Sequence, residues 1–362
     1  MRLVAKYGTS SLTDHAGRID DAAVAKAAAE IAAARAAGHE VLVVTSGAVA
    51  AGLPVLGIDT RPGDARTLQA VSAVGQAQLV QTWSRHLGAH GLVAGQVLLA
   101  PLDFMVRTQY VHAKDTLERL LELGVVPVVN ENDVIADDEI RFGDNDRIAA
   151  LLAQLASCEL LVLLTDTPGL MDADPRVVEE ASLIEEIVAV DASLEELAGG
   201  SGTDRGSGGM ASKLAAAKMA AWSGVRAVIA HADRPAVLVE AIDGVAGVGT
   251  VVRPRAARLN ARKLWIAFAV VPSGRVVVDE GAAAAIAAGG RSLLAAGVVE
   301  VQGEFDAGAA VEVVGPGGGV VAKGLVGVGS DELRGMAGLR SADLEGRDGA
   351  VVHVDDLVVL PD

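Results

Sequence analysis

Short polar side chains are concentrated in the stretch VVNENDVIADDEIRFGDND. Asn130 and Asp133 lie in its first cluster, and Asp144, Asn145 and Asp146 form its second. A carboxylate accepts hydrogen bonds from an ammonium group and an amide donates to a carboxylate, so the clusters suit a zwitterionic ligand; their oxygens suit Mg²⁺ equally well. A helix cap before the apolar run that follows needs only one such residue. We therefore expect a binding site here.

Two lysines lie where they could neutralise an anion. Lys6 ends the apolar segment RLVAK, and Lys213 follows the glycine loop of DRGSGGMASK, which contains Gly206, Gly208 and Gly209. Backbone N–H groups of such a loop and of a helix start, together with an ammonium group, can bind phosphate. Each stretch alone has an ordinary alternative, a solvated lysine or a flexible linker. The second is not a Walker loop, because no strand leads into GKS or GKT.

Two more apolar segments end in hydroxyl or carboxylate side chains. VVTSGAVAAG passes through Ser46 into an alanine-rich helix, whose start would stabilise a carboxylate or phosphate, although the plain alternative is an N-cap. LLTDTPG ends in Thr165 and Asp166, which suit a ribose or purine edge, or a simple turn.

The chain lacks the usual signatures of a general base, a nucleophile or a zinc site. None of its seven histidines falls in these clusters, no Cys/His spacing suggests zinc, and no serine-hydrolase elbow occurs. Phosphoryl transfer to a carboxylate would explain the missing base, since the acceptor is already ionised at neutral pH. The remaining requirement is charge neutralisation, which two lysines and Mg²⁺ can supply.

These residues need a framework that brings strand ends together. Short β-branched runs alternate with alanine-rich helical ones, which predicts β-α-β units, right-handed crossovers and an open, mostly parallel sheet sandwiched by helices. We expect the first helix at about 22–37, with Gly38 as its stop. In open α/β sheets ligands bind at the carboxyl ends of strands. The predicted strands are 2–6, 40–47, 91–99, 125–133, 158–166 and 224–231.

The bulk numbers predict two domains. The 362 residues are 51% apolar but only 2% aromatic, so we expect a core of Ala, Val and Leu. The basic connector RPRAARLNARKLW precedes a region of short Val- and Gly-rich strands, and we expect domains at 1–258 and 259–362. A net charge of −17 disfavours nucleic acid. A lone Cys158 fits the cytoplasm, and no apolar run approaches the roughly 20 residues of a membrane span.

Taken in order, KYGTS, VTSGAVAAG, NENDVIADDEIRFGDND, LLTDTPGLMDADP and SGGMASK resemble the amino acid kinase family over essentially the whole chain, and the C-terminal region resembles the PUA domain. The resemblance implies the amino acid kinase fold with a small, mostly β PUA domain. It implies ATP-dependent phosphorylation of the side-chain carboxylate of L-glutamate to L-glutamyl 5-phosphate, the first step of proline biosynthesis.

The family's site residues carry over position by position. Lys6 and Lys213 would stabilise the transferring phosphoryl group, and Asp146 would orient them. The acceptor would be bound by Ser46, Asn130, Asp133, Asp144 and Asn145. The nucleotide would be bound by Lys6, Thr165, Asp166, Ser207, Gly208, Gly209, Met210, Ala211, Ser212 and Lys213. Tyr7 stands where a smaller aliphatic residue is usual, and its ring could crowd the phosphate site and affect the catalytic rate, not the fold.

The resemblance also implies Mg²⁺ with the ATP, feedback inhibition by proline and a homo-oligomer. The near alternative is another carboxylate or carbamate kinase, with acetylglutamate as a plausible acceptor. RNA binding by the PUA region is a second alternative, which its 8 basic and 14 acidic residues disfavour. A catalytically dead regulatory subunit is disfavoured because both lysines and the acidic cluster remain.

Overall fold

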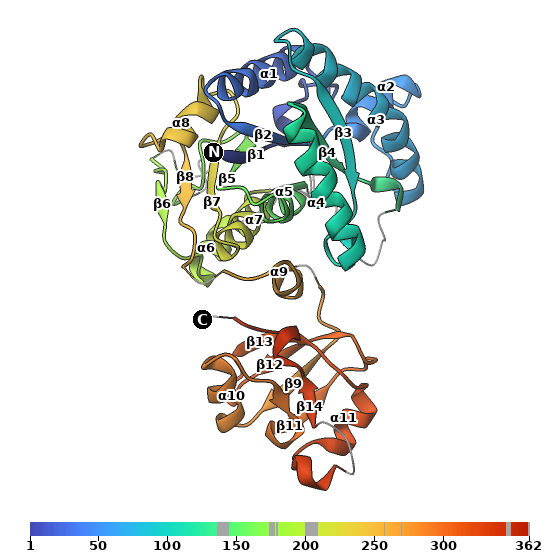
Figure 1. The fold of residues 1–362 in the computed structure, drawn as a ribbon, viewed down its shortest axis with the longest axis vertical. Helices are drawn as coiled ribbons and strands as arrows, with labels where there is room; N and C mark the ends of the chain where they lie inside the picture. Colours follow the sequence, from blue (N-terminus) through green and yellow to red (C-terminus); the bar gives the residue numbers. More distant parts are fainter. Residues whose placement is uncertain are drawn as a thin grey trace. The chain divides into compact units, whose positions relative to one another are not determined.

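The computed structural model describes residues 1–135, 145–173, 178, 180–199, 209–256, 258–268, 270–344 and 349–360 (Figure 1). Asp144, Gly206, Ser207 and Gly208, which carry predicted roles, lie outside the described residues. The chain divides into two compact units, Met1–Leu259 and Asn260–Asp362.

The first unit is built on one mostly parallel sheet, which confirms the predicted fold class. Its strand order is β3-β4-β2-β1-β5-β7-β8-β6, in which β8 runs antiparallel to β7. The strands are β1 (Arg2–Tyr7), β2 (Glu40–Thr45), β3 (Ala94–Leu99), β4 (Val126–Glu131), β5 (Leu160–Thr165), β6 (Glu186–Ile187), β7 (Arg226–His231) and β8 (Thr250–Val252).

Helices cover both faces of this sheet (Figure 1). One layer holds α1 (Asp21–Ala36), α2 (Ala48–Val55), α3 (Ala65–Gly88) and α8 (Val237–Asp243). The other holds α4 (Arg107–Glu122), α5 (Asn145–Leu155), α6 (Ala192–Gly199) and α7 (Met210–Trp222). The first helix matches its prediction closely: the side chain of Asp20 caps its start, and Gly38, with φ of +86°, follows its end.

The core of the first unit is aliphatic, as its composition predicted. Alternate residues of β1 face opposite layers, so Leu3, Ala5 and Tyr7 pack with α1 and α3. Trp83 on α3 is fully buried, and its indole N–H donates to the hydroxyl of Thr45 at the end of β2 (3.0 Å). Cys158 is also buried, and burial raises the pKa of its thiol, which fits a structural role.

The second unit is a small β-rich domain. A five-stranded sheet of order β11-β9-β12-β13-β15 and the pair β10–β14 enclose an aliphatic core of their own. Its strands are β9 (Gly274–Val278), β10 (Leu293–Leu294), β11 (Val298–Gln302), β12 (Ala310–Val314), β13 (Val320–Leu325), β14 (Ala350–Val352) and β15 (Leu357–Val359). Its helices are α9 (Ala261–Phe268), α10 (Glu280–Ala287) and α11 (Ser330–Met336). No helix in the described part of either unit is long and apolar enough to cross a membrane.

Candidate active site

One carboxylate joins the two lysines that the sequence singled out. The Nζ atom of Lys6, near the end of β1, lies 2.5 Å from Oδ1 of Asp146. The Nζ atom of Lys213, on the first turn of α7, lies 3.2 Å from Oδ2 of the same residue. The hydroxyl of Ser212 also donates to Oδ2 (2.8 Å). Three segments far apart in the sequence therefore meet at Asp146.

This cluster is almost completely buried and brings two ammonium groups to one carboxylate. The side chain of Asp146 has no exposed surface, and those of Lys6 and Lys213 are 3% and 4% exposed. Burial by itself would raise the pKa of Asp146, but the two ammonium groups outweigh it and hold that pKa below its ordinary value. Two ammonium groups around one carboxylate are chemistry suited to an anionic ligand.

The glycine after β1 leaves room beside this charge. A Cβ atom added at Gly8 would lie 3.5 Å from Nζ of Lys6, so a side chain there would fill the space next to the ammonium group. The start of α7 offers further donors, because the backbone N–H groups of Met210, Ala211 and Ser212 precede the first intrahelical bond, which Lys213 makes to Gly209 (3.3 Å). The N-cap, Gly209, has no side chain to occupy them. Such a cradle suits phosphate oxygens.

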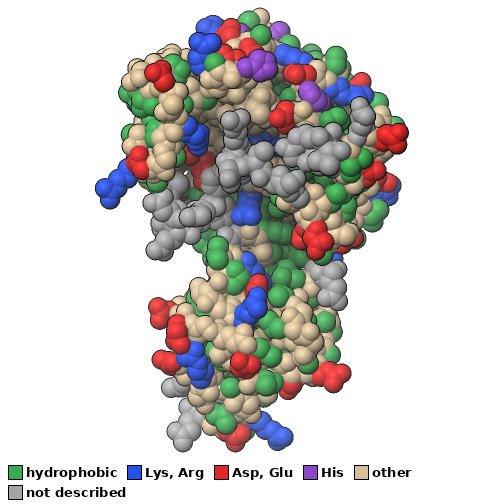
Figure 2. Space-filling model, turned by 180° about the vertical axis from the view of Figure 1, so that it is seen from behind, with side chains coloured by type: hydrophobic (Ala, Val, Ile, Leu, Met, Phe, Trp, Pro, Cys, Tyr) green, Lys and Arg blue, Asp and Glu red, His purple; other side chains and the backbone are tan. Residues whose placement is uncertain are grey.

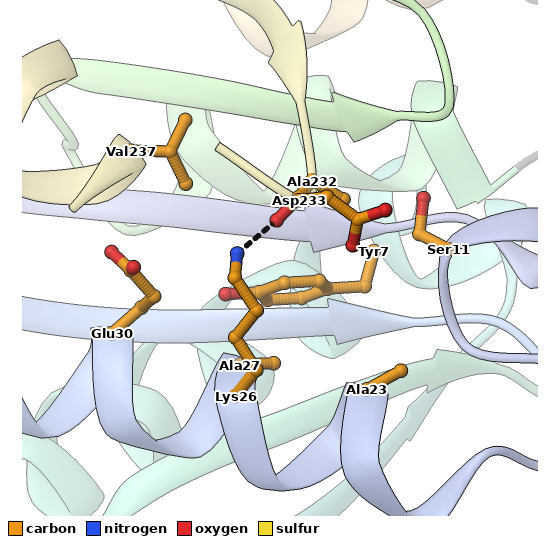
Figure 3. Close-up of a pocket in the computed structure, with 9 residues that line it drawn as sticks. All are labelled: Tyr7, Ser11, Ala23, Lys26, Ala27, Glu30, Ala232, Asp233 and Val237. Carbon is orange, nitrogen blue, oxygen red and sulfur yellow. Dashed lines mark hydrogen bonds between the residues drawn. The ribbon is translucent and has the colours of Figure 1, made fainter. Parts of the chain in front are cut away.

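Tyr7 does not crowd this cradle, contrary to the expectation from sequence. It follows Lys6 on β1 and therefore faces the opposite layer, where it lines a small cavity with Ala27 and Glu30 of α1 (Figure 3). Its ring lies 5.5 Å from that of Trp83, centroid to centroid. Its hydroxyl is buried and has no hydrogen-bond partner among the described residues, and burial raises its pKa.

We expect Tyr7→Phe to leave turnover within about twofold of the wild type and stability within about 1 kcal/mol, because the hydroxyl removed makes no hydrogen bond in the described structure. Steady-state kinetics and thermal unfolding would measure both quantities. A tenfold fall in kcat would show that Tyr7 acts on the reacting face of the sheet after all.

Amide side chains form a connected network on the flank of β1 that carries β2 and β4. The side chain of Asn145, the first residue of α5, donates to Oγ of Ser46 and to Oδ1 of Asn130, both at 3.0 Å. The backbone N–H of Glu131 donates to Oδ1 of Asn130 (2.9 Å) and to Oδ1 of Asn145 (3.2 Å). Because a backbone N–H can only donate, it fixes which end of each amide is the oxygen.

Ser46 is not the N-cap that the ordinary interpretation assumed. The N-cap of α2 is Gly47, which makes no side-chain capping bond. Ser46 instead accepts from Asn145, so its own hydroxyl hydrogen remains to be donated elsewhere. Ser46 can therefore donate to an anionic ligand beside the start of α2.

Asp133 lies just beyond the end of β4 and is largely buried. The hydroxyl of Ser72 on α3 donates to its Oδ2 atom. Burial raises the pKa of Asp133, and the Ser72 hydrogen bond and the nearby charge of Arg61 only partly offset that effect. A partly buried carboxylate of this kind gains from pairing with a cationic group of a ligand.

The nucleotide residues predicted on β5 lie on the opposite side of β1. Thr165 ends β5 and is buried, and its hydroxyl donates to Oδ1 of the exposed Asp166 (3.1 Å). In the strand order, β2 and β4 lie to one side of β1, and β5 and β7 to the other. Lys6 on β1 therefore stands between an amide- and carboxylate-rich half and the half that carries Thr165.

Sequence reasoning missed two residues of this site. Ser72 and Gln76 are buried polar side chains in the middle of α3, and each is bonded to a predicted binding residue. Their signal was weak: two polar residues spaced i, i+4 on an otherwise buried face. Groups of three or more His, Cys, Asp or Glu side chains able to hold a metal are absent from the described residues.

Comparison with known proteins agrees with this geometry. A model described as the amino acid kinase family matches residues 1–231, and one described as the PUA domain matches residues 274–346. The chain belongs to the amino acid kinase family. Within that family it is similar to curated proteins named glutamate 5-kinase. That of Burkholderia multivorans is 44% identical over 99% of this chain and 98% of its own.

Other relatives carry the same name. The glutamate 5-kinases of Ralstonia nicotianae and Geobacter sulfurreducens are 45% and 42% identical, each over 99% of this chain and 97% of their own. The crystal structure of aspartate kinase from Synechocystis aligns with 76% of this chain and 44% of its own, at 20% identity and a TM-score of 0.49.

Proposed function

We propose that this protein transfers the terminal phosphoryl group of ATP to the side-chain carboxylate of L-glutamate, producing L-glutamyl 5-phosphate for proline biosynthesis. One observation carries the proposal: the buried Lys6–Asp146–Lys213 cluster lies between two parts of the site. One part has amide and carboxylate side chains suited to an amino acid, and the other has backbone N–H groups suited to phosphate. The relatives named glutamate 5-kinase, aligned over nearly the whole chain, support the acceptor.

The chemistry follows from charge. The acceptor carboxylate attacks as an anion, so it needs no base, but it must approach a phosphoryl group that is itself negatively charged. Lys6 and Lys213 would offset that repulsion, and Asp146 would hold the two ammonium groups in place. Mg²⁺, held chiefly by the nucleotide phosphates, would supply further charge neutralisation.

The two halves of the site would divide the substrates. On the acceptor side, Asp133 would accept from the α-ammonium group of glutamate, and Ser46, Asn130 and Asn145 would bind or orient its carboxylates. On the nucleotide side, Thr165, Asp166 and the residues Gly209–Lys213 would bind ATP. Asp144, Ser207 and Gly208 remain predictions because they lie outside the described residues.

The direct test is ADP release from ATP and Mg²⁺ with L-glutamate, paired with hydroxylamine trapping of the acyl phosphate. N-acetylglutamate serves as the rival acceptor, since it lacks the ammonium group that Asp133 would bind. We expect product with glutamate and little with the acetylated acceptor. Preference for N-acetylglutamate would make the protein a different carboxylate kinase, and no product with either would overturn the proposal.

We expect the KM for glutamate to depend on pH through Asp133. Its pKa is raised by burial, so the ionised form that binds an ammonium group is lost on acidification at a pH above the usual range of aspartate. KM should therefore be constant at high pH and rise as pH falls through that raised pKa. Kinetics from about pH 5 to 8 would show this. Asp133→Asn should have a high KM without that pH dependence; an unchanged profile would contradict the assignment.

We also propose cytoplasmic location, homo-oligomerisation and inhibition by proline, with domains at 1–258 and 259–362. The lone buried Cys158 fits a reducing compartment. RNA remains a disfavoured partner of the PUA domain, whose surface shows acidic side chains among a few basic ones (Figure 2). Adding proline to the assay above would test the proposed inhibition. Light scattering would give the size of the protein in solution and test homo-oligomerisation.

A further inference from the structure

Helix α3 turns two polar side chains towards the acceptor half of the site. Ser72 and Gln76 are 4% and 8% exposed, and their i, i+4 spacing places them on one face of the helix. Neither belongs to the residues that the family resemblance assigned. Each forms a hydrogen bond with a residue that the resemblance did assign to the acceptor, Ser72 with Asp133 and Gln76 with Asn130.

Gln76 fixes the orientation of Asn130. Since Oδ1 of Asn130 accepts from the backbone N–H of Glu131, its Nδ2 atom must be the end that faces Gln76. It donates to Oε1 of Gln76 (2.7 Å). The same Oδ1 atom accepts from Asn145, so the orientation set at Gln76 and Glu131 extends through Asn130 to Asn145 and on to Ser46.

Only one end of the Gln76 amide is satisfied. Nε2 of Gln76 is buried and has no hydrogen-bond partner among the described residues. A buried donor without an acceptor destabilises the fold, and an apolar side chain of the same length would remove that cost but would leave Nδ2 of the buried Asn130 without its acceptor. What the glutamine contributes is the carbonyl that holds Asn130.

Ser72 acts on Asp133 in a comparable way. Its hydroxyl donates to Oδ2 of Asp133, which fixes the carboxylate and favours its ionised form. Together the two side chains of α3 hold the acidic and the amide parts of the acceptor half.

Close helix packing fixes α3 relative to Ser46. A Cβ atom at Gly75 would lie 1.8 Å from the carbonyl oxygen of Ala48, and one at Gly52 would lie 2.1 Å from that of Val71. Helix α2, which contains Ala48 and Gly52, begins two residues after Ser46. The residue next to Gln76 is thus in backbone contact with the helix that Ser46 leads into.

We propose that Ser72 and Gln76 are positioning residues for the acceptor substrate, with Gln76 orienting Asn130 and Asn145 and Ser72 orienting Asp133. The inference rests on the proposed function, in which those three residues bind glutamate.

The first test is Gln76→Met, with Gln81→Met on the exposed side of the same helix as its control. We expect about a tenfold rise in the KM for glutamate, with the KM for ATP and kcat within about threefold, and a melting temperature within about 5 °C of the wild type, because the buried donor lost at Gln76 is offset by the one left unpaired at Asn130. The control should match the wild type. A glutamate KM within twofold of the wild type, or equal rises in both KM values, would overturn the role of Gln76.

The second test is Ser72→Ala, with the exposed Ser84→Ala as its control. Loss of the hydrogen bond should raise the pKa of Asp133 further, so the rise in glutamate KM on acidification should begin at a higher pH than in the wild type. A merely structural serine would leave that profile where it is, which would overturn the role of Ser72.

Failure of the proposed function would be visible separately. The wild type is assayed beside every variant with glutamate and with N-acetylglutamate. The variant-to-wild-type ratios of KM and kcat are then calculated for the acceptor that the wild type phosphorylates. No activity of the wild type on glutamate rejects the proposed function. An active wild type whose α3 variants are indistinguishable from it rejects the positioning roles alone.

Discussion

Replacing Lys213 by methionine should lower kcat by about 10²–10³-fold while changing the KM for glutamate by less than about threefold. Methionine has a similar length but no charge, and the position is buried, so water cannot substitute for the ammonium group. Asp146 would lose one of its two ammonium partners, and the positive charge available to the transferring phosphoryl group would fall by one. ADP release under saturating ATP and glutamate would measure the effect.

Lys218→Met is the matched control on the same helix. Lys218 pairs with Glu195 at 2.5 Å and takes no part in the cluster at Asp146. It should retain wild-type turnover. Intact turnover in Lys213→Met would remove the catalytic assignment of that residue, and an equal loss in both variants would point to damage to α7 instead.

Gly75→Ala should destabilise the protein by about 2–4 kcal/mol, because the added methyl group collides with backbone that cannot give way cheaply. The new Cβ atom would lie 1.8 Å from the carbonyl oxygen of Ala48 and 2.4 Å from the backbone nitrogen of Gly52. Helices α2 and α3 would have to move apart. Thermal unfolding should show a fall of roughly 5–15 °C for a domain of this size.

Gly88→Ala supplies the control, at the C-terminal end of α3. A Cβ atom there meets nothing within 4 Å, so the higher helix propensity of alanine should leave stability equal or raise it by up to about 1 kcal/mol. A Gly75→Ala variant that melts with the wild type would show that α2 and α3 can separate without cost, and would weaken the argument that α3 is fixed against Ser46.

The arrangement of the site was largely predictable because parallel strands end at one edge of a sheet. Lys6, Ser46, Asn130 and Thr165 each follow an apolar run, and those runs are adjacent strands in the structure. Side-chain alternation along β1 also separates Lys6 from Tyr7. That rule was available from the sequence, and it already places the ring of Tyr7 on the face of the sheet opposite Lys6.

Other features depended on packing that no local pattern records. The position of Ser46 before a helix predicted an N-cap. Its hydroxyl instead accepts a hydrogen bond from Asn145, which is close only in the folded chain. Ser72 and Gln76 looked like ordinary polar residues of a long helix. Their roles arise because two glycines let α3 approach α2 closely enough to face the end of β4, and helix–helix approach is a tertiary property.

The strand order has a consequence for how such an enzyme can change. In the proposed site, the segments assigned to the acceptor lie on one flank of β1 and the β5 residues assigned to the nucleotide on the other, with Lys6 of β1 between them. With that division, substitutions that alter which acid is accepted could accumulate around β2, α3 and β4 without disturbing the residues proposed to bind ATP. One fold with this division could therefore serve enzymes that act on different acceptor acids and use the same phosphoryl donor.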